Sequence, residues 1–143
     1  MKVNLRKSLF ILPNLFTLSS VLCGFYSVVL CASEPTEDDF YRASLLILFA
    51  MLFDAVDGRV ARLTKTQSAI GVQLDSLADV ISFGVAPAVL VYAWSLEALG
   101  ALGIFAGFCY VACGTIRLAR FNVMTMSDSG APKEPGKYTH GLP

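Results

Sequence analysis

The sequence predicts an all-α integral membrane protein with four transmembrane helices and a short amphipathic helix at its N-terminus. Hydrophobic residues make up 55% of the 143-residue chain, and its apolar runs reach the roughly 20 residues that a helix needs to cross hydrocarbon. The chain is short enough for a single domain, which we expect over residues 1–143. With 11 basic and 11 acidic residues, its balanced charge gives no indication of nucleic-acid binding.

The predicted elements follow in order along the chain. Residues 1–12 mix basic and apolar side chains, which is typical of a short helix on the membrane surface. A signal peptide is disfavoured because the apolar run that follows is longer than the hydrophobic core of a signal peptide. Pro13 suits the first turn of the helix that follows. Polar loops are expected near residues 33–39, 63–70 and 125–140. The four spans are expected at about 14–32, 41–63, 72–94 and 96–123.

Basic residues predict how the chain sits in the membrane. They gather before the first span, between the second and third, and after the fourth, whereas the other two loops are mainly acidic. Because cytoplasmic loops carry the excess of Lys and Arg, the N-terminus and these loops should face the cytoplasm, in the cell membrane if the source is prokaryotic. The basic residues are Lys2, Arg6, Lys7, Arg59, Arg62, Lys65, Arg117, Arg120, Lys133 and Lys137.

Four aspartates lie in the second and third predicted spans, where ionisable side chains are costly and usually functional. Helical periodicity places two of them on one face of the second span and two, four residues apart, on one stripe of the third. A short turn makes the two helices antiparallel neighbours, so we expect the carboxylates to converge. The residues on these faces are Asp54, Asp57, Gly58, Ala61 and the bordering Arg62, then Gly71, Asp75 and Asp79.

Such a cluster predicts a site for divalent cations and phosphate. Neighbouring carboxylates repel one another, and oxygen ligands favour Mg²⁺, Mn²⁺ or Ca²⁺ over zinc. Gly58 and Ala61 leave room beside the carboxylates, and Arg62 suits phosphate oxygens. The alternative is that Gly58 and Ala61 form a helix-packing notch while Asp57 and Arg62 merely pair.

These residues resemble the CDP-alcohol phosphotransferase family, whose motif D-x2-D-G-x2-A-R-x8-G-x3-D-x3-D is filled at every fixed position from Asp54 to Asp79. The resemblance implies a homodimer of six-helix membrane subunits that transfers a phosphatidyl-type group from a CDP-linked donor to an alcohol and releases CMP. The segments Pro13–Thr17, Gly114–Asn122 and Gly141–Pro143 are similar to the CDP-diacylglycerol–serine O-phosphatidyltransferases. By that resemblance the chain holds the first four of six helices and is truncated at its C-terminus.

The resemblance also implies roles for individual residues. The expected reaction joins CDP-diacylglycerol and L-serine into phosphatidylserine and CMP, with two Mg²⁺ or Mn²⁺ ions. Asp54, Asp57 and Asp75 would hold one ion, and Asp79 would join shared carboxylates at the second and act as general base. The expected CDP-donor-binding residues are Asp57, Gly58, Ala61, Arg62, Gly71, Asn14 and Thr17.

Three assignments leave alternatives open. Asn14 and Thr17 either touch the nucleotide or cap the first span. Arg117, Arg120 and Asn122 either bind the serine acceptor, whose carboxylate an arginine can hold, or, for the arginines, anchor lipid headgroups. The acceptor could instead be glycerol 3-phosphate or inositol phosphate, and a divalent-cation transporter would also use intramembrane carboxylates.

Overall fold

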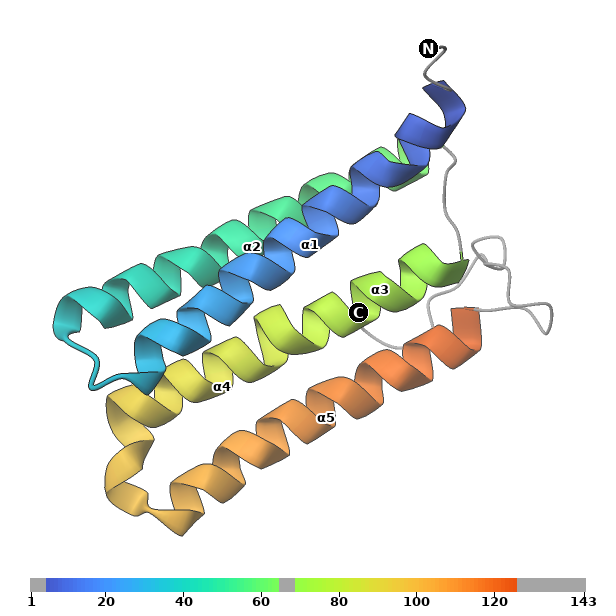
Figure 1. Ribbon diagram of the computed structural model, residues 1–143. Helices are drawn as coiled ribbons and strands as arrows, with labels where there is room; N and C mark the ends of the chain where they lie inside the picture. Colours follow the sequence, from blue (N-terminus) through green and yellow to red (C-terminus); the bar gives the residue numbers. More distant parts are fainter. Residues whose placement is uncertain (1–4, 65–68, 126–143) are drawn as a thin grey trace.

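The structure, a computed structural model, describes residues 5–64 and 69–125, with side chains for residues 14–60 and 70–124. Every regular element in these ranges is a helix (Figure 1). Between Ala69 and Leu99 one composite helix is built from five consecutive segments, which we call the third helix. The elements are α1 (Leu5–Ala32), α2 (Glu37–Thr64), α3 (Ala69–Asp79), η1 (Val80–Val85), α4 (Ala86–Val91), η2 (Tyr92–Leu96), η3 (Glu97–Leu99) and α5 (Ala101–Thr125).

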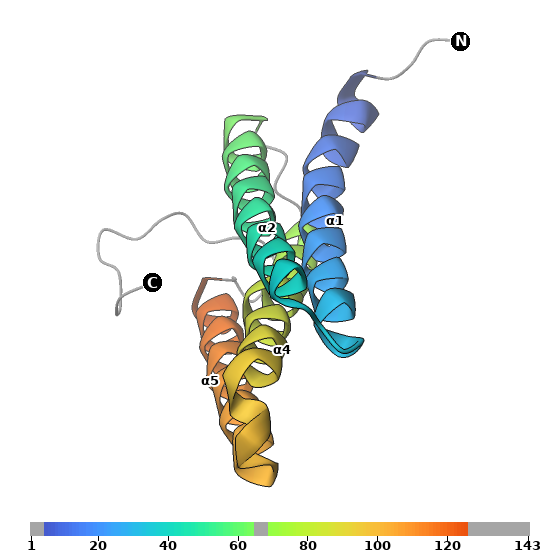
Figure 2. The same ribbon diagram turned by 90° about the vertical axis from the view of Figure 1, so that its left-hand side faces the viewer.

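The third helix lies at the centre of the arrangement. It has α1 on one side and α5 on the other in both views (Figure 1, Figure 2). α1 and α2 run antiparallel and contact one another from Ser27 and Ala43 to Thr17 and Asp57, and α2 also reaches η1 and α4. The C-terminal ends of α2 and α5 and the start of α3 therefore lie at the same end of the bundle (Figure 1).

Among the described residues, three helices are long and apolar enough to cross a membrane: Asn14–Ala32, Ile70–Leu99 and Ala101–Met124. This agrees with an integral membrane protein. The second predicted span is not among them, although α2 is 28 residues long, as α1 is. The reason is its charge, since α2 carries Arg42, Asp54, Asp57 and Arg59 within its apolar stretch.

The N-terminal amphipathic helix is not a separate element. α1 runs without a break from Leu5 to Ala32, so Pro13 lies inside this helix rather than in the first turn of a new one. A proline lacks one backbone donor, and a helix can continue past it when its other hydrogen bonds are kept.

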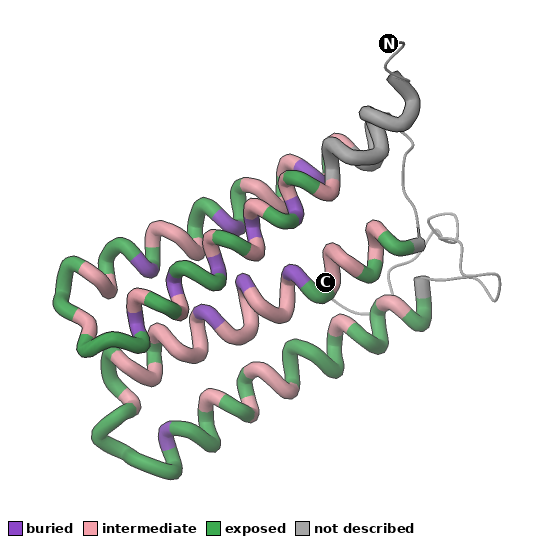
Figure 3. Tube along the Cα trace, viewed as in Figure 1, coloured by how far each residue is buried: buried purple, intermediate pink, exposed green. Residues whose placement is uncertain are grey.

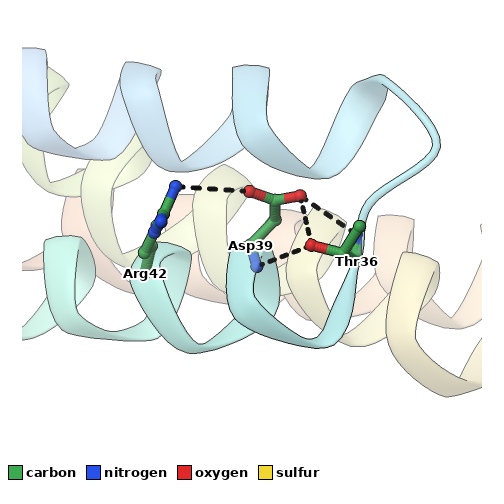
Figure 4. A network of polar contacts seen from close by, with 3 residues as sticks. All are labelled: Thr36, Asp39 and Arg42. Atoms are coloured by element: carbon green, nitrogen blue, oxygen red, sulfur yellow. Dashed lines mark hydrogen bonds and ion pairs between the residues drawn. The ribbon is translucent and has the colours of Figure 1, made fainter.

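The loop between α1 and α2 is shorter than expected, because residues 37–39 belong to α2. Thr36 and Asp39 form a capping box, in which the Thr36 N–H and hydroxyl donate to the Asp39 carboxylate at 3.0 and 2.7 Å (Figure 4). Arg42 lies 3.9 Å from the same carboxylate. The hydrogen bonds from Thr36, helped by Arg42, lower the pKa of Asp39 below its ordinary value.

The boundary between the third helix and α5 falls later than predicted. Leu96 ends η2, and α5 begins only at Ala101. Gly100 makes the turn with a φ of 54°, a left-handed conformation that glycine adopts readily. Gly103 then lies against the Leu96 carbonyl, where a Cβ would clash with it, so this glycine serves packing within the chain.

Small side chains let the first three helices approach closely. The buried residues in the described part are mostly Ala and Ser, as expected where helices associate through packing and hydrogen bonds rather than through exclusion from water. Ser27 donates a 3.1 Å hydrogen bond to the Ala43 carbonyl of α2, and Ser20 and Ser82 link α1 to η1. Figure 3 shows these buried positions on α1, α2 and the third helix, whereas α5 is largely exposed.

Candidate active site

The site begins with three aspartates from two helices. Asp54 and Asp57 lie one turn apart near the C-terminal end of α2, and Asp75 lies on α3. One carboxylate oxygen from each lies within 4.8 Å of the other two. The convergence predicted from helical spacing is therefore confirmed for these three residues. Asp57 is the most enclosed of them, being only 3% exposed.

Asp79, the last residue of α3, completes the group. Its carboxyl shares a hydrogen bond with Asp54. Its Oδ1 is buried and meets no hydrogen-bond partner in the described part of the chain. A buried carboxylate oxygen without a partner is expensive, and a ligand at this atom would offset that cost.

The backbone changes its winding directly after Asp79. Over η1 the helix widens to a π-helical turn, at whose end the Ala86 N–H bonds to the Ile81 carbonyl, five residues earlier. Such turns are often found at functional sites. Here the wider turn brings Ser82 to face α1, where its hydroxyl donates to the Ser20 carbonyl at 3.0 Å.

Thr17 reaches the site from α1. Its hydroxyl donates a 2.7 Å hydrogen bond to Asp57 Oδ2, and both side chains are buried. The capping hypothesis for Thr17 and Asn14 is wrong, because both residues lie well inside α1, where backbone groups already have partners in the helix. Thr17 contacts a predicted metal ligand instead.

Four residues of the predicted donor site lie on the helices that carry the aspartates. Gly58 and Gly71 are half-buried, on α2 and α3 respectively. Ala61 and Arg62 lie in the last turns of α2, but their side chains fall outside the described residues. The choice between a nucleotide-binding face and a helix-packing notch therefore stays a prediction.

The predicted acceptor residues lie near the C-terminal end of α5, and the structure separates them. Asn122 Nδ2 donates a 2.7 Å hydrogen bond to Ser76 Oγ, next to Asp75 in the sequence, and so joins α5 to the site. Arg117 and Arg120 are exposed. The binding role and the headgroup role of the arginines both stay predictions.

Three serines that position the site were missed by the sequence reasoning. Ser76 accepts from Asn122 and donates to the Val72 carbonyl at 3.1 Å, and Ser20 and Ser82 join α1 to η1. The available signal was a serine within an apolar span, because such hydroxyls commonly hydrogen-bond between membrane helices.

The donor set fits a hard divalent cation. Three clustered carboxylates supply only oxygen ligands, and Asp79, which shares a hydrogen bond with Asp54, places a further carboxylate beside them. Bound metal would offset the mutual repulsion of these acids. A phosphate-bearing ligand can share such a metal, since Mg²⁺ is usually bound by few carboxylates together with substrate phosphates.

Comparison with known proteins decides the family. Residues 10–142 match the model of the CDP-alcohol phosphatidyltransferase family, which is nearly the whole chain. The chain belongs to this family. No solved structure is significantly similar to it.

Several curated proteins resemble this CDP-alcohol phosphatidyltransferase chain. A CDP-diacylglycerol–serine O-phosphatidyltransferase of Helicobacter pylori (strain ATCC 700392 / 26695) is 44% identical over 117 residues, covering 82% of this chain and 48% of that protein. The enzyme of the same name from Saccharomyces cerevisiae is 43% identical over 138 residues, covering 92% and 49%. An archaetidylserine synthase of Methanothermobacter thermautotrophicus is 40% identical over 134 residues, covering 92% and 52%. The chain thus spans about half the length of these relatives.

Proposed function

We propose that this chain transfers the phosphatidyl group of CDP-diacylglycerol to the hydroxyl of L-serine, giving phosphatidylserine and CMP in phospholipid biosynthesis. The observation that carries the proposal is the convergence of Asp54, Asp57 and Asp75 from two helices, with Asp79 beside them. Serine as acceptor is supported by the names of the similar proteins, which are serine transferases or an archaetidylserine synthase. These names give no support to the transporter alternative.

The four aspartates would hold two Mg²⁺ or Mn²⁺ ions. When bound, such cations neutralise the donor pyrophosphate and stabilise the charge that develops on the departing CMP. Asp54, Asp57 and Asp75 would form the first ligand set, and Asp79 would join shared carboxylates in the second. The unpartnered Oδ1 of Asp79 supports this role, because a ligand there would satisfy a buried acceptor.

Asp79 is also the proposed general base. It takes the proton from the serine hydroxyl, whose oxygen forms a bond to the phosphorus that carries diacylglycerol. The bond from that phosphorus to the CMP oxygen breaks, and CMP leaves with the electron pair. A carboxylate performs this proton transfer when it lies within hydrogen-bond reach of the alcohol.

Binding of the donor falls to the faces beside the aspartates. Gly58, Ala61 and Gly71 carry little or no side-chain bulk, so the CMP group can approach the helix backbone there. Arg62 offers a planar cation to its phosphate. Asn14 lies on α1, at the end of the helix pair that also holds Thr17 and Asp57.

The serine acceptor is proposed to bind at the C-terminal end of α5. The hydrogen bond from Asn122 to Ser76 supports this, since it joins that end of α5 to the residue that follows Asp75. Arg117 and Arg120 lie five and two residues earlier on the same helix and are exposed, so their guanidinium groups are accessible to a carboxylate.

We further propose that α2 is the fourth membrane-crossing helix and that the site faces the cytoplasm. α2 is antiparallel to α1 along its length, which supports a crossing of the same bilayer. Arg59, Arg117 and Arg120 lie towards the end of the bundle that holds the aspartates, as the excess of positive charge on cytoplasmic ends predicts.

A homodimer, which the family resemblance implies, completes the proposal. Large apolar side chains of α5 are exposed, among them Leu102 and Phe108 at 72% and 64%, so this helix has area to offer a second copy within the bilayer. Cross-linking through the exposed Cys113 would capture a partner that approaches α5. Absence of the cross-linked dimer, together with a monomeric mass in detergent, would reject the dimer.

The decisive experiment is a CMP-release assay on the purified protein in lipid–detergent micelles with CDP-diacylglycerol and Mg²⁺ or Mn²⁺. We expect release that depends on serine, with phosphatidylserine formed in equal amount. Release only with glycerol 3-phosphate or inositol phosphate would keep the chemistry and change the acceptor. Divalent-cation uptake into vesicles without CMP release under any condition would favour the transporter and overturn the proposal.

A further inference from the structure

A buried hydrogen bond joins α1 to the aspartate cluster. Thr17 Oγ1 donates to Asp57 Oδ2 at 2.7 Å across 40 residues of sequence. The two side chains are 5% and 3% exposed, so neither solvent nor lipid competes for this contact. A hydrogen bond to an ionised acceptor is about twice as strong as one between neutral groups.

This contact constrains the orientation of the Asp57 carboxylate. A carboxylate that accepts a hydrogen bond through Oδ2 loses rotational freedom, and it keeps lone pairs that can be directed at a cation. Asp57 is the member of the three-aspartate group that lies deepest in the protein. Of the three aspartates, Asp57 is therefore the one whose side-chain rotation would change the metal ligand set most.

The framework around Thr17 makes the contact rigid. One turn further along α1, the Ser20 and Ser82 hydroxyls lie 3.3 Å apart, and Ser82 also donates to the Ser20 carbonyl. At the next turn, Gly24 lies directly against the Ser82 backbone. α1 is thus held to both aspartate-bearing helices, to α2 by Thr17 and to the third helix by Ser20 and Gly24.

We infer that Thr17 is a positioning residue that fixes the Asp57 carboxylate for divalent-cation binding, rather than a residue that binds the CDP donor. Residues of this kind hold a ligand by its second oxygen, and their loss typically lowers metal affinity 10- to 100-fold. The inference rests on the metal site of the proposed function. It does not depend on which alcohol is the acceptor.

The test measures Mn²⁺ affinity by electron paramagnetic resonance on the full chain in detergent, without substrate. A series at position 17 grades the donor while keeping the size similar: threonine, Thr17→Ser, Thr17→Cys and Thr17→Val. We expect Thr17→Ser to bind Mn²⁺ like the natural residue, Thr17→Cys more weakly because a thiol is a poor donor, and Thr17→Val about 10- to 100-fold more weakly.

Ser27→Ala is the matched control. Ser27 also lies on α1, is buried, and donates to α2, but it does so about 15 Å from Thr17 along the helix axis. We expect Ser27→Ala to lower the unfolding temperature about as much as Thr17→Val, with unchanged Mn²⁺ affinity. If Thr17→Val does not fold, the Ser and Cys variants carry the comparison.

The outcomes separate this inference from the proposed function. Equal Mn²⁺ affinity across the position-17 series overturns the inference, as does an equal loss of affinity in Ser27→Ala. An unaltered KM for CDP-diacylglycerol at saturating Mn²⁺ in Thr17→Val supports positioning, whereas a raised KM under those conditions restores the donor-binding role. A position-17 effect on Mn²⁺ binding in a protein that releases no CMP would leave the inference standing and reject the proposed function.

Discussion

Gly24 of α1 lies so close to Ser82 of η1 that a Cβ on the glycine would sit 2.8 Å from the Ser82 Cα. Real Cβ atoms do not approach backbone this closely, so the backbones of α1 and the third helix are in close contact here. The contact lies one turn from the Ser20–Ser82 hydrogen bonds. It therefore fixes the spacing of the two helices at the depth where Asp79 ends α3.

Gly24→Ala should consequently destabilise the protein. Forcing a methyl group into this contact must shift the backbone of α1 or η1, which typically costs about 1–3 kcal/mol. The midpoint of thermal unfolding in detergent measures the effect. Gly114→Ala is the control, because its Cβ would meet nothing within 4 Å and alanine is the better helix former. An equal response of both variants would contradict the close contact.

Asp79→Asn should abolish turnover while donor binding remains measurable. The amide keeps the shape of the side chain but cannot accept the proton of the serine hydroxyl, and loss of a general base typically lowers kcat by about 10²- to 10⁴-fold. CMP release and equilibrium binding of CDP-diacylglycerol would be measured on the same preparation. Normal turnover in this variant would reject Asp79 as the base.

Removal of divalent cations should stop CMP release reversibly. Chelation leaves the Asp54, Asp57 and Asp75 carboxylates clustered without counter-charge, and added Mg²⁺ or Mn²⁺ should restore the rate. Asp54→Asn should raise the Mn²⁺ concentration needed for half-maximal rate by about tenfold or more, because the variant loses a charged metal ligand. Asp38→Asn, an exposed acid at the far end of α2, should leave it unchanged.

Arg117→Ala and Arg120→Ala test the acceptor site one residue at a time. An arginine that holds the serine carboxylate contributes a charge-assisted, bidentate contact, so its loss should raise the serine KM about 10- to 100-fold. Arg42→Ala provides the comparison, since Arg42 is also exposed but lies at the other end of the helix pair. A serine KM unchanged in both test variants would leave the arginines as headgroup anchors.

The capping box at the start of α2 predicts a pH dependence of stability. The folded-state pKa of Asp39 is lowered mainly by the Thr36 hydroxyl. The ionised carboxylate therefore stabilises the fold at pH values above its unfolded-state pKa, about 3.9. This stabilisation is lost as the pH falls through the lower, folded-state value. The difference in unfolding temperature between the natural chain and Asp39→Ala should be full at pH 6 and vanish in strong acid; a constant difference would contradict the shift.

Much of the site could be predicted because it depends on local periodicity. Asp54 and Asp57 are three residues apart and therefore share one helix face, and Asp75 and Asp79, four residues apart, share another. A short connection brings the two helices together. The contact of Thr17 with Asp57 was not accessible in this way. A threonine near the start of an apolar run resembles a cap, and its partner 40 residues away is chosen by the crossing of two helices.

Helix boundaries show the same limit. Glu37, Asp38 and Asp39 look like loop residues by polarity, yet acidic residues suit the first turn of a helix because they oppose its positive end. Gly100, rather than the polarity of Glu97, marks the end of the third helix. The first π-helical turn of the third helix also has a partner that periodicity does not reveal, since the Tyr110 hydroxyl of α5 donates to the Phe83 carbonyl at 3.0 Å.

The position of Thr17, the aspartates and Ser82 on the first three long helices has a consequence for biosynthesis. Proteins are made from the N-terminus, and their early parts fold first. The described residues of the first three long helices that shape the carboxylate cluster, from Thr17 to Ser82, precede α5 in the sequence. We therefore expect the carboxylate cluster to assemble first and α5 to dock onto it afterwards, through Tyr110 and Asn122.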